Sequence, residues 1–233
     1  ALGFDYTPGD CIARLTADGL EPLEEIVIAY AVDDFGMSRG TLKSALEMMK
    51  GGDLVYEDEH WRPTGAGVYR ASFDFPEPIG RQPVSRLPAG EIVTVPHHTR
   101  TRKVTALITT RTIAPAPLSQ LLPFVMPGVS LTLRTPLRGL LARGVGLLPE
   151  GPGEDDRREA SFTVVADAHA RDGTSRRGVV RGKDVYGLTA VTLVAGAELM
   201  SAPGFDGSGA LGPAAAFDSA ALLNRVGLSW QLG

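Results

Sequence analysis

The sequence of 233 residues predicts an α+β protein in which helices pack on a mixed, largely antiparallel sheet. Three observations predict this class. Segments rich in Val, Ile and Thr, with strand-like apolar patterns, occur near both ends of the chain and in its middle. Helical segments separate them without the regular strand–helix–strand rhythm of a doubly wound sheet. The 28 glycines and 17 prolines divide the chain into short elements.

Composition narrows the class of protein. Hydrophobic residues make up 43% of the chain and charged residues 21%, which is typical of a folded globular protein. The formal net charge of -4 argues against a nucleic-acid partner, because such proteins are usually basic. The single cysteine, Cys11, excludes an internal disulfide bond and fits a reducing compartment, so we expect a cytoplasmic protein. No apolar run approaches the roughly 18 residues of a membrane-spanning helix.

The first part of the chain predicts a helix, a strand and a second helix. Pro8 suits the first turn of a helix that continues through residues 11–15. Residues 25–32 are apolar on both faces, which predicts a central strand covered on both sides. Ser38 or Thr41 then caps the second helix.

The middle of the chain predicts three extended segments. Residues 68–75 alternate between apolar and polar side chains, with Tyr69 and Phe73 on the inner face, and predict a half-buried strand. Residues 91–95 predict a short extended piece after a proline-rich loop. Residues 103–113, rich in Thr, Val and Ile, predict another strand.

The pattern after residue 160 predicts a β-hairpin. Residues 162–171 alternate, and an Asp-Gly pair at positions 172 and 173 indicates a two-residue type I′ turn before the returning strand at 174–181. This turn places His169 opposite Arg176 on the polar face.

The C-terminal part predicts one long helix and two short elements. Residues 186–200 are apolar nearly all round, which predicts a buried helix. Pro213 opens a short helical turn, and residues 228–231 close the chain as a strand.

One motif matches in letters only. Residues 207–212 read G-S-G-A-L-G, but the dinucleotide-binding G-x-G-x-x-G needs a strand before it and a helix after it within about 30 residues. A long helix precedes this run, so we interpret it as a glycine-rich turn. We therefore expect the chain to hold no nucleotide-binding fold of its own.

His97 and His98 form the only histidine pair. Adjacent side chains diverge, whereas two helical metal ligands stand four residues apart, so we predict no metal site. Residues 94–96 would place the pair on a loop at the end of a strand, where active-site groups are frequent. Two interpretations remain open: a solvated or capping pair, or one histidine that lines a substrate pocket.

The leucine-rich stretch at residues 118–148 also has two interpretations. It predicts either core helices whose arginines extend to solvent, or a mobile apolar lid or groove for a lipid-like or polyketide chain. Contact of this stretch with a membrane surface is the less favoured alternative.

The opening segment, residues 3–10, combines two acids, two glycines, two aromatic residues and a proline. A helix that begins at Pro8 presents free N–H groups and partial positive charge, which suit an anionic or carbonyl oxygen. Asp10, in the first helical turn, favours the helix dipole.

Four segments together resemble the saccharopine dehydrogenase-like oxidoreductases. Residues 3–10 (GFDYTPGD) resemble the segment that follows the N-terminal Rossmann domain of that family, although Tyr6 stands where serine is frequent. Residues 90–98 (GEIVTVPHH) are similar to its glycine–glutamate–strand–proline segment, with His98 near a position often held by arginine. Residues 182–190 (GKDVYGLTA) and 209–217 (GALGPAAAF) are similar to its closing helix start and its ending.

The resemblance implies an NAD(P)-dependent enzyme with the nicotinamide between two domains. It implies that residues 1–183 form a substrate-binding and dimerisation domain of the saccharopine dehydrogenase C-terminal type. Residues 184–233 would supply a helix and strand that pack back on an absent Rossmann domain. The cofactor would be bound through that domain and not by this chain alone.

The resemblance also implies roles for particular residues. Asp5 and Tyr6 would border the nicotinamide, where the tyrosine hydroxyl orients a carbonyl or donates a proton. Gly3, Phe4 and Pro8 would contribute to the cofactor side, and His97 or His98 would shape the substrate pocket. Relatives include enoyl reductases that act on polyketide lipids, so a carbonyl, imine or enoyl substrate is expected.

We therefore expect the substrate-binding half of an oxidoreductase, dimeric and inactive as an isolated chain, that acts on a small-molecule or lipid-like substrate. The alternative is a non-catalytic dimerisation or lipid-binding module. Binding of NADPH that requires the upstream domain would distinguish the two.

Overall fold

The computed structural model describes residues 2–44, 53–64, 71–113, 144, 146 and 150–233, and every structural statement below concerns these residues. The helices are α1 (Thr7–Ala17), α3 (Glu91–Thr94), the 3₁₀ turn η1 (Val95–His97), α4 (Thr110–Ile113), α7 (Glu154–Glu159), α8 (Val185–Ser201), α9 (Pro213–Ala216) and α10 (Ser219–Arg225). The strands are β1 (Leu23–Asp33), β2 (Asp53–Glu57), β3 (His60–Thr64), β4 (Ala71–Asp74), β5 (Arg81–Arg86), β6 (Lys103–Thr109), β7 (Ser161–Ala170), β8 (Ser175–Lys183) and β9 (Ser229–Leu232).

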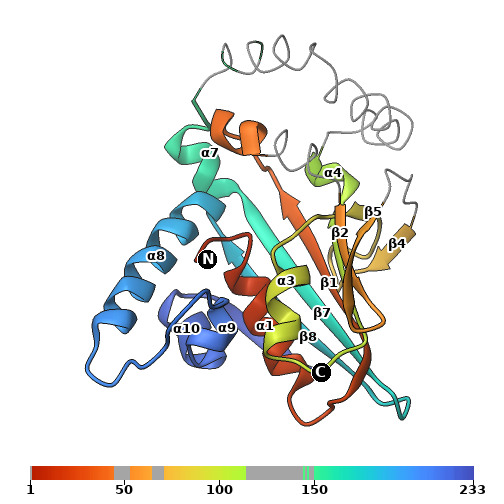
Figure 1. The fold of residues 1–233 in the computed structure, drawn as a ribbon. Helices are drawn as coiled ribbons and strands as arrows, with labels where there is room; N and C mark the ends of the chain where they lie inside the picture. Colours follow the sequence, from red (N-terminus) through yellow and green to blue (C-terminus); the bar gives the residue numbers. More distant parts are fainter. Residues whose placement is uncertain (1, 45–52, 65–70, 114–143, 145, 147–149) are drawn as a thin grey trace.

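The strands form one sheet in the order β3-β2-β6-β1-β7-β8-β9, and β5 pairs with both β4 and β6. Strands β1 and β6 pair in parallel, while the other named strand pairs in the described residues are antiparallel. Helices α1, α3, α8, α9 and α10 lie on one side of the sheet (Figure 1). This arrangement confirms the predicted α+β class with a mixed, largely antiparallel sheet.

The larger core lies between the sheet and these helices. Ile12 of α1 and Leu222 of α10 pack there against Ile28 and Val164 of the central strands. A smaller core on the opposite face includes Ala29, Val84, Leu107 and Val165. Strand β1 is therefore covered on both faces, as its doubly apolar sequence predicts.

The hairpin of β7 and β8 has a different turn from the one predicted. Strand β7 ends at Ala170 and β8 begins at Ser175, and Gly173 takes the left-handed conformation (φ 92°). This geometry shifts the register by one residue, so His169 lies opposite Ser175 and Arg176 lies opposite Ala168. The predicted pairing of His169 with Arg176 is wrong, because Asp172 is part of a longer turn and does not form the first position of a two-residue one.

The segment predicted as extended at 91–95 is helical instead. Residues 91–94 form α3, and η1 continues it through His97. Tertiary contacts of Glu91 and Thr94, described below, outweigh the strand preference of the β-branched side chains between them. The next strand, β6, ends at Thr109 and not at residue 113, because α4 follows it directly.

Helix α8 is only half buried, which corrects the prediction of a buried helix. Val185, Leu188 and Thr192 face the core, whereas Val191 and Val194 are 50% and 60% exposed. An all-round apolar pattern predicts two apolar faces, but in the described part of the chain only one of them has a partner.

The remaining elements agree with the sequence pattern. Pro8 lies in the first turn of α1, Pro213 opens α9, and the closing strand β9 pairs with β8. The predicted strand at 68–75 is represented by β4, although its first residues lie outside the described part, as do residues 118–143 of the leucine-rich stretch. No helix among the described residues has the length and apolar content required to cross a bilayer.

Candidate functional site

The candidate site is centred on the first turns of α1, where a carboxylate is completely buried. Asp10 is 0% exposed, and its two oxygens form hydrogen bonds with three residues from two other segments. Thr94 Oγ1 donates to Oδ1 at 2.6 Å, and the backbone N–H of Ala214 donates to Oδ2 at 2.9 Å. His98 Nε2 lies 2.8 Å from Oδ1. These donors replace the hydration that a buried carboxylate loses.

The two histidines diverge, as adjacent side chains were expected to do. The His98 side chain is 6% exposed and lies between Asp10 and the hydroxyl of Thr99, which is 3.0 Å from Nδ1. The two imidazole nitrogens of His98 therefore contact two different polar side chains. His97 is exposed, and its ring lies 5.6 Å from that of Trp61. His97 is the last residue of η1 and His98 is its C-cap, so the pair ends a helix and does not follow a strand, which corrects the predicted setting.

A second buried pair lies beside the same helix. The Tyr30 hydroxyl donates to Oε1 of Glu91, and both side chains are buried. Burial raises the pKa of Glu91 to about 8, and the nearby Asp10 and Asp5 contribute in the same direction, while the Tyr30 hydrogen bond opposes them. Glu91 therefore holds its proton at neutral pH.

Gly9 is essential to this packing, because a side chain there would collide with Glu91 Oε1 and the Tyr30 hydroxyl. Within the described residues, Oε2 of Glu91 and the hydroxyl of Thr7 have no hydrogen-bond partner. The first turn of α1 thus lies directly on a neutral, buried carboxylic acid.

The four segments that carry the sequence resemblance meet at α1. Residues 3–10 contact residues 90–98 through Asp10 with Thr94 and His98, and contact residues 209–217 through Asp10 with the Ala214 N–H. They contact residues 182–190 through a hydrogen bond of 3.1 Å from the Phe4 N–H to Thr189 Oγ1. Segments separated by up to about 200 residues in sequence therefore form one cluster.

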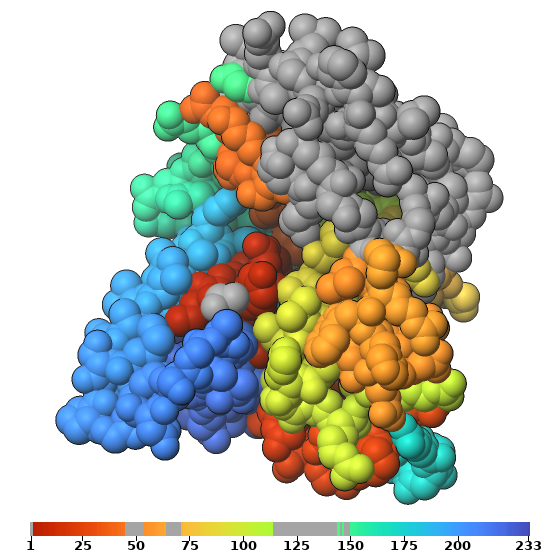
Figure 2. Space-filling view, viewed as in Figure 1, coloured from red at the N-terminus to blue at the C-terminus, as the bar shows by residue number. Residues whose placement is uncertain are grey.

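Asp5 and Tyr6 lie on the outer side of this cluster. The Tyr6 ring packs on Gly90, where a side chain would collide with it, and Tyr6 is partly exposed. Asp5 is exposed, yet the surrounding protein removes part of its hydration and raises its pKa. Figure 2 shows the N-terminal segment (red) reaching the surface between α8 (blue) and the region of α3 (yellow-green).

The three residues predicted to contribute to cofactor binding are less accessible. Phe4 and Pro8 are buried, and the Phe4 ring makes edge contacts with those of Tyr30 and Phe162 at 5.7 and 4.8 Å. Gly3 is partly buried beside Thr189. Their part in cofactor binding stays a prediction, and of this segment Asp5 and Tyr6 offer the accessible polar groups.

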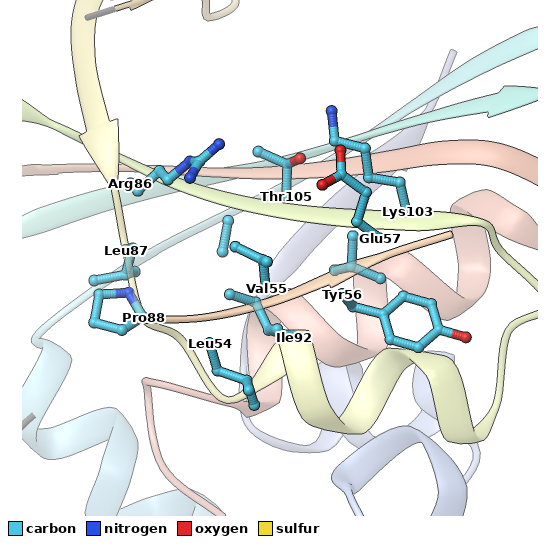
Figure 3. Close-up of a pocket in the computed structure, with 12 residues that line it drawn as sticks. Leu54, Val55, Tyr56, Glu57, Arg86, Leu87, Pro88, Ile92, Lys103 and Thr105 are labelled. Carbon is cyan, nitrogen blue, oxygen red and sulfur yellow. The ribbon is translucent and has the colours of Figure 1, made fainter. Parts of the chain in front are cut away.

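A pocket of about 100 Å³ lies on the other side of α3 (Figure 3), lined by residues 54–57, 86–88, 92 and 103–106. We call it the through-sheet pocket. Ile92 of α3 forms part of its wall, while the neighbouring Glu91 faces Tyr30. The partly exposed Trp61 contacts the same helix, because its indole N–H donates a hydrogen bond of 3.0 Å to the Ile92 carbonyl.

Other candidate chemistry has no support in the described residues. They contain no group of three or more His, Cys, Asp or Glu side chains placed to hold a metal ion. Cys11 is fully buried, and burial raises its thiol pKa far above the ordinary value, so it is a poor nucleophile. Residues 207–212 lie between α8 and α9 and follow no strand.

Sequence reasoning missed most members of the buried cluster. The pattern assigns Asp10 only to the helix dipole, and it places Tyr30, Glu91 and Thr94 in extended segments. A signal was available for Asp10 and Glu91, because an acid between apolar neighbours in a segment that packs inward must find a partner or a proton.

Comparisons with known proteins show a likeness in structure and none in sequence. No protein-family model matches the sequence, and no curated protein sequence matches it. The structure is similar to apo histidine-tagged saccharopine dehydrogenase (L-Glu forming) from Saccharomyces cerevisiae, with a TM-score of 0.49 and 12% sequence identity. The alignment covers 96% of this chain and 71% of that chain.

Proposed function

We propose that this chain is the substrate-binding half of a saccharopine dehydrogenase-like oxidoreductase. In this proposal a separate dinucleotide-binding domain holds most of NAD(P), and this chain presents the substrate to it. The substrate carries a carbonyl, imine or enoyl group, on a small or lipid-like molecule. The same proposal includes a homodimer, because the corresponding domain of the family commonly dimerises.

The observation that carries the proposal is the convergence at Asp10. The resemblance rests on four separate segments, and nothing in their sequence requires them to be neighbours. An accidental similarity would leave such segments scattered, whereas here each contacts residues 3–10. Shared sequence markers that meet at one place support a common site.

Asp5 and Tyr6 are the residues of this cluster that can act on a bound molecule. The Tyr6 hydroxyl can orient a substrate oxygen or donate a proton to it. Desolvation raises the pKa of Asp5 above that of an ordinary aspartate, and its carboxyl group lies at the same surface. The cofactor supplies the hydride, and the share of this chain is to bind and orient the substrate.

The residues of this chain fit the nicotinamide end of a dinucleotide better than its phosphates. A phosphate cradle needs a glycine-rich turn between a strand and a helix N-terminus, and residues 207–212 lack the strand. The exposed polar groups of Asp5 and Tyr6 suit hydrogen bonding to an amide or a ribose. A second domain would therefore supply the phosphate site.

Helix α8 offers a surface on which such a domain can pack. Its exposed stripe consists of Ala190, Val191, Leu193, Val194, Ala197 and Met200. The stripe is apolar over most of its length, which is typical of an interdomain or intersubunit contact.

NADPH titration tests the proposal. We expect residues 1–233 together with the proposed dinucleotide-binding domain to bind NADPH with a saturable change in nicotinamide fluorescence, and residues 1–233 alone to show none. A Tyr6→Phe variant of this two-domain assembly should keep NADPH affinity but lose turnover, because the ring packing on Gly90 is retained. Saturable NADPH binding by residues 1–233 alone would contradict the proposal.

The α8 stripe also favours the second candidate, a non-catalytic dimerisation module. Sedimentation velocity of residues 1–233 distinguishes the two, using Val194→Asp as the variant and Glu198→Gln on the same helix as the control. A dimer that Val194→Asp dissociates, together with absence of NADPH binding in the two-domain assembly, would support the module.

A further inference from the structure

The through-sheet pocket arises from an unusual feature of strand pairing. Strands β2 and β5 both pair with the same edge of β6, β2 at residues 103–104 and β5 at residues 107–109. Between these two ladders, Ala106 receives a hydrogen bond of 2.9 Å from the Leu87 N–H as the chain leaves β5. The sheet therefore has an opening where its two flanking strands separate.

The alternation of side chains gives the pocket two chemically different ends. Val104 and Ala106 belong to the core on the helix side, where Ile92 and Leu87 also pack. Lys103 and Thr105 point to the opposite face, where both contact Glu25. Figure 3 shows the charged ends of Arg86, Glu57 and Lys103 on one side of the opening and the apolar Leu54, Leu87, Pro88 and Ile92 on the other.

The apolar end has the size of a short alkyl chain. The pocket volume of about 100 Å³ is two thirds of the roughly 150 Å³ of an apolar cavity known to bind benzene. By this scale it accommodates about four carbon atoms. A longer chain would have to leave the opening and gain little from burial.

The charged end selects the head group. Three charged side chains line it, namely the cations Arg86 and Lys103 and the acid Glu57. Glu25 lies behind the lining, where it pairs with Lys103 at 3.0 Å and accepts a hydrogen bond from Thr105. Arg86 is exposed and already has an interaction within the chain, and its guanidinium group carries five N–H donors, enough to bind a further carboxylate as well.

We propose that the through-sheet pocket binds a short-chain aliphatic monocarboxylate, with its alkyl chain on the helix side of the sheet and its carboxylate toward Arg86. This ligand site is separate from the cluster at Asp5 and Tyr6, and it does not depend on the proposed redox function. The wall that the two sites share is α3, through Ile92 on one side and Glu91 on the other.

A chain-length series tests the alkyl end. Sodium propanoate, pentanoate and heptanoate are titrated into ¹⁵N-labelled protein of residues 1–233, and amide chemical shifts are followed. Because each buried methylene contributes about a four-fold gain in affinity, pentanoate should bind roughly 15-fold more tightly than propanoate. Heptanoate should bind no more than about two-fold more tightly than pentanoate. The shifts should centre on residues 54–57, 86–92 and 103–106.

Head-group probes and charge variants test the other end. Pentylamine and 1-pentanol have the same chain as pentanoate and should bind more weakly. Arg86→Gln should weaken pentanoate binding about five-fold, and Glu57→Gln should strengthen it about two-fold. Arg81→Gln, an exposed arginine of the same strand outside the lining, is the matched control and should change nothing.

Opposite effects of two exposed charges are not expected from a loss of folding. The proposal is overturned if pentanoate shifts spread over the surface, if pentylamine binds as tightly as pentanoate, or if affinity keeps rising through heptanoate. None of these readouts involves NADPH, so this result and that of the proposed redox function are independent.

Discussion

The imidazole Nε2 of His98 lies 2.8 Å from the carboxylate of Asp10, and both side chains are almost completely buried. The two residues are 88 positions apart, and their contact joins α1 to η1. A second oxygen of the same carboxylate joins α1 to the start of α9. Asp10 is therefore the group through which three distant segments are held in place.

Replacement of Asp10 should strongly destabilise the protein. Asp10→Ala leaves Thr94, His98 and the Ala214 N–H buried without an acceptor, and each such group costs about 1–3 kcal/mol. We expect a loss of about 3–5 kcal/mol in the free energy of unfolding, measured by urea denaturation. Asp18→Ala, at the exposed end of α1, should change the free energy by less than about 1 kcal/mol. Similar effects of the two substitutions would contradict the role of Asp10.

The two adjacent histidines should respond very differently to substitution. His98→Ala removes a buried donor and leaves a cavity, so we expect a loss of about 2–4 kcal/mol. His97→Ala removes an exposed ring that contacts Trp61, and we expect about 0.5 kcal/mol. Thermal denaturation of both variants is the measurement, and a larger effect at His97 would refute the assignment of the buried partner.

Glu91 should make stability depend on pH. Burial raises its pKa to about 8 in the folded chain, against about 4.5 in the unfolded chain. Between these values the folded state keeps a proton that the unfolded state has released, so stability falls as pH rises toward 8. Across this range the free energy of unfolding falls by about 1.4 kcal/mol per pH unit. The stabilisation that Glu91 contributes is fully present below about pH 4.5 and is lost above about pH 8.

Glu91→Gln keeps the shape of the side chain without the titration. The difference in unfolding free energy between wild type and this variant should therefore change steadily between about pH 5 and pH 8 and level off above it. Glu159→Gln, at an exposed position, serves as the control. A pH-independent difference for Glu91→Gln would show that Glu91 is ionised in the folded state.

Helix α1 lies so close to Tyr30 and Glu91 at Gly9 that a methyl group added there should destabilise the protein. Gly9→Ala would place its Cβ in collision with both buried polar groups, and we expect a loss of about 1–3 kcal/mol. At Gly40 the nearest atom to an added Cβ is Ser38 Oγ at 3.6 Å, so Gly40→Ala should be neutral or stabilising by up to about 1 kcal/mol. Equal unfolding midpoints for the two variants would exclude the packing described here.

The sequence predicts an element correctly where its local pattern is compatible with only one structure. Residues 25–32 are apolar on both faces and form the central strand, because only a covered strand buries both sets of side chains. Pro8 and Pro213 mark true helix starts, because their fixed φ and missing N–H suit the first turn. The divergence of His97 and His98 follows from their adjacency.

Prediction from the sequence fails where contacts between residues far apart in the chain determine the local structure. Residues 91–94 have strand-forming side chains, yet the burial of Glu91 on Tyr30 and the bond of Thr94 to Asp10 hold them in a helix. The hairpin register depends on whether the loop has two or three residues, which an Asp-Gly pair does not determine. The cluster at Asp10 involves four segments, and only their assembly reveals it.

We propose that the surface between α8 and the Asp5–Tyr6 segment is where a second domain packs and NADPH reaches the substrate. Hydrogen–deuterium exchange of residues 1–233 with the proposed dinucleotide-binding domain, compared with residues 1–233 alone and measured with and without NADPH, tests this most directly. We expect slower exchange over residues 186–200 in the two-domain assembly and further slowing at residues 2–7 when NADPH is added. Identical exchange of both segments under all of these conditions would contradict it.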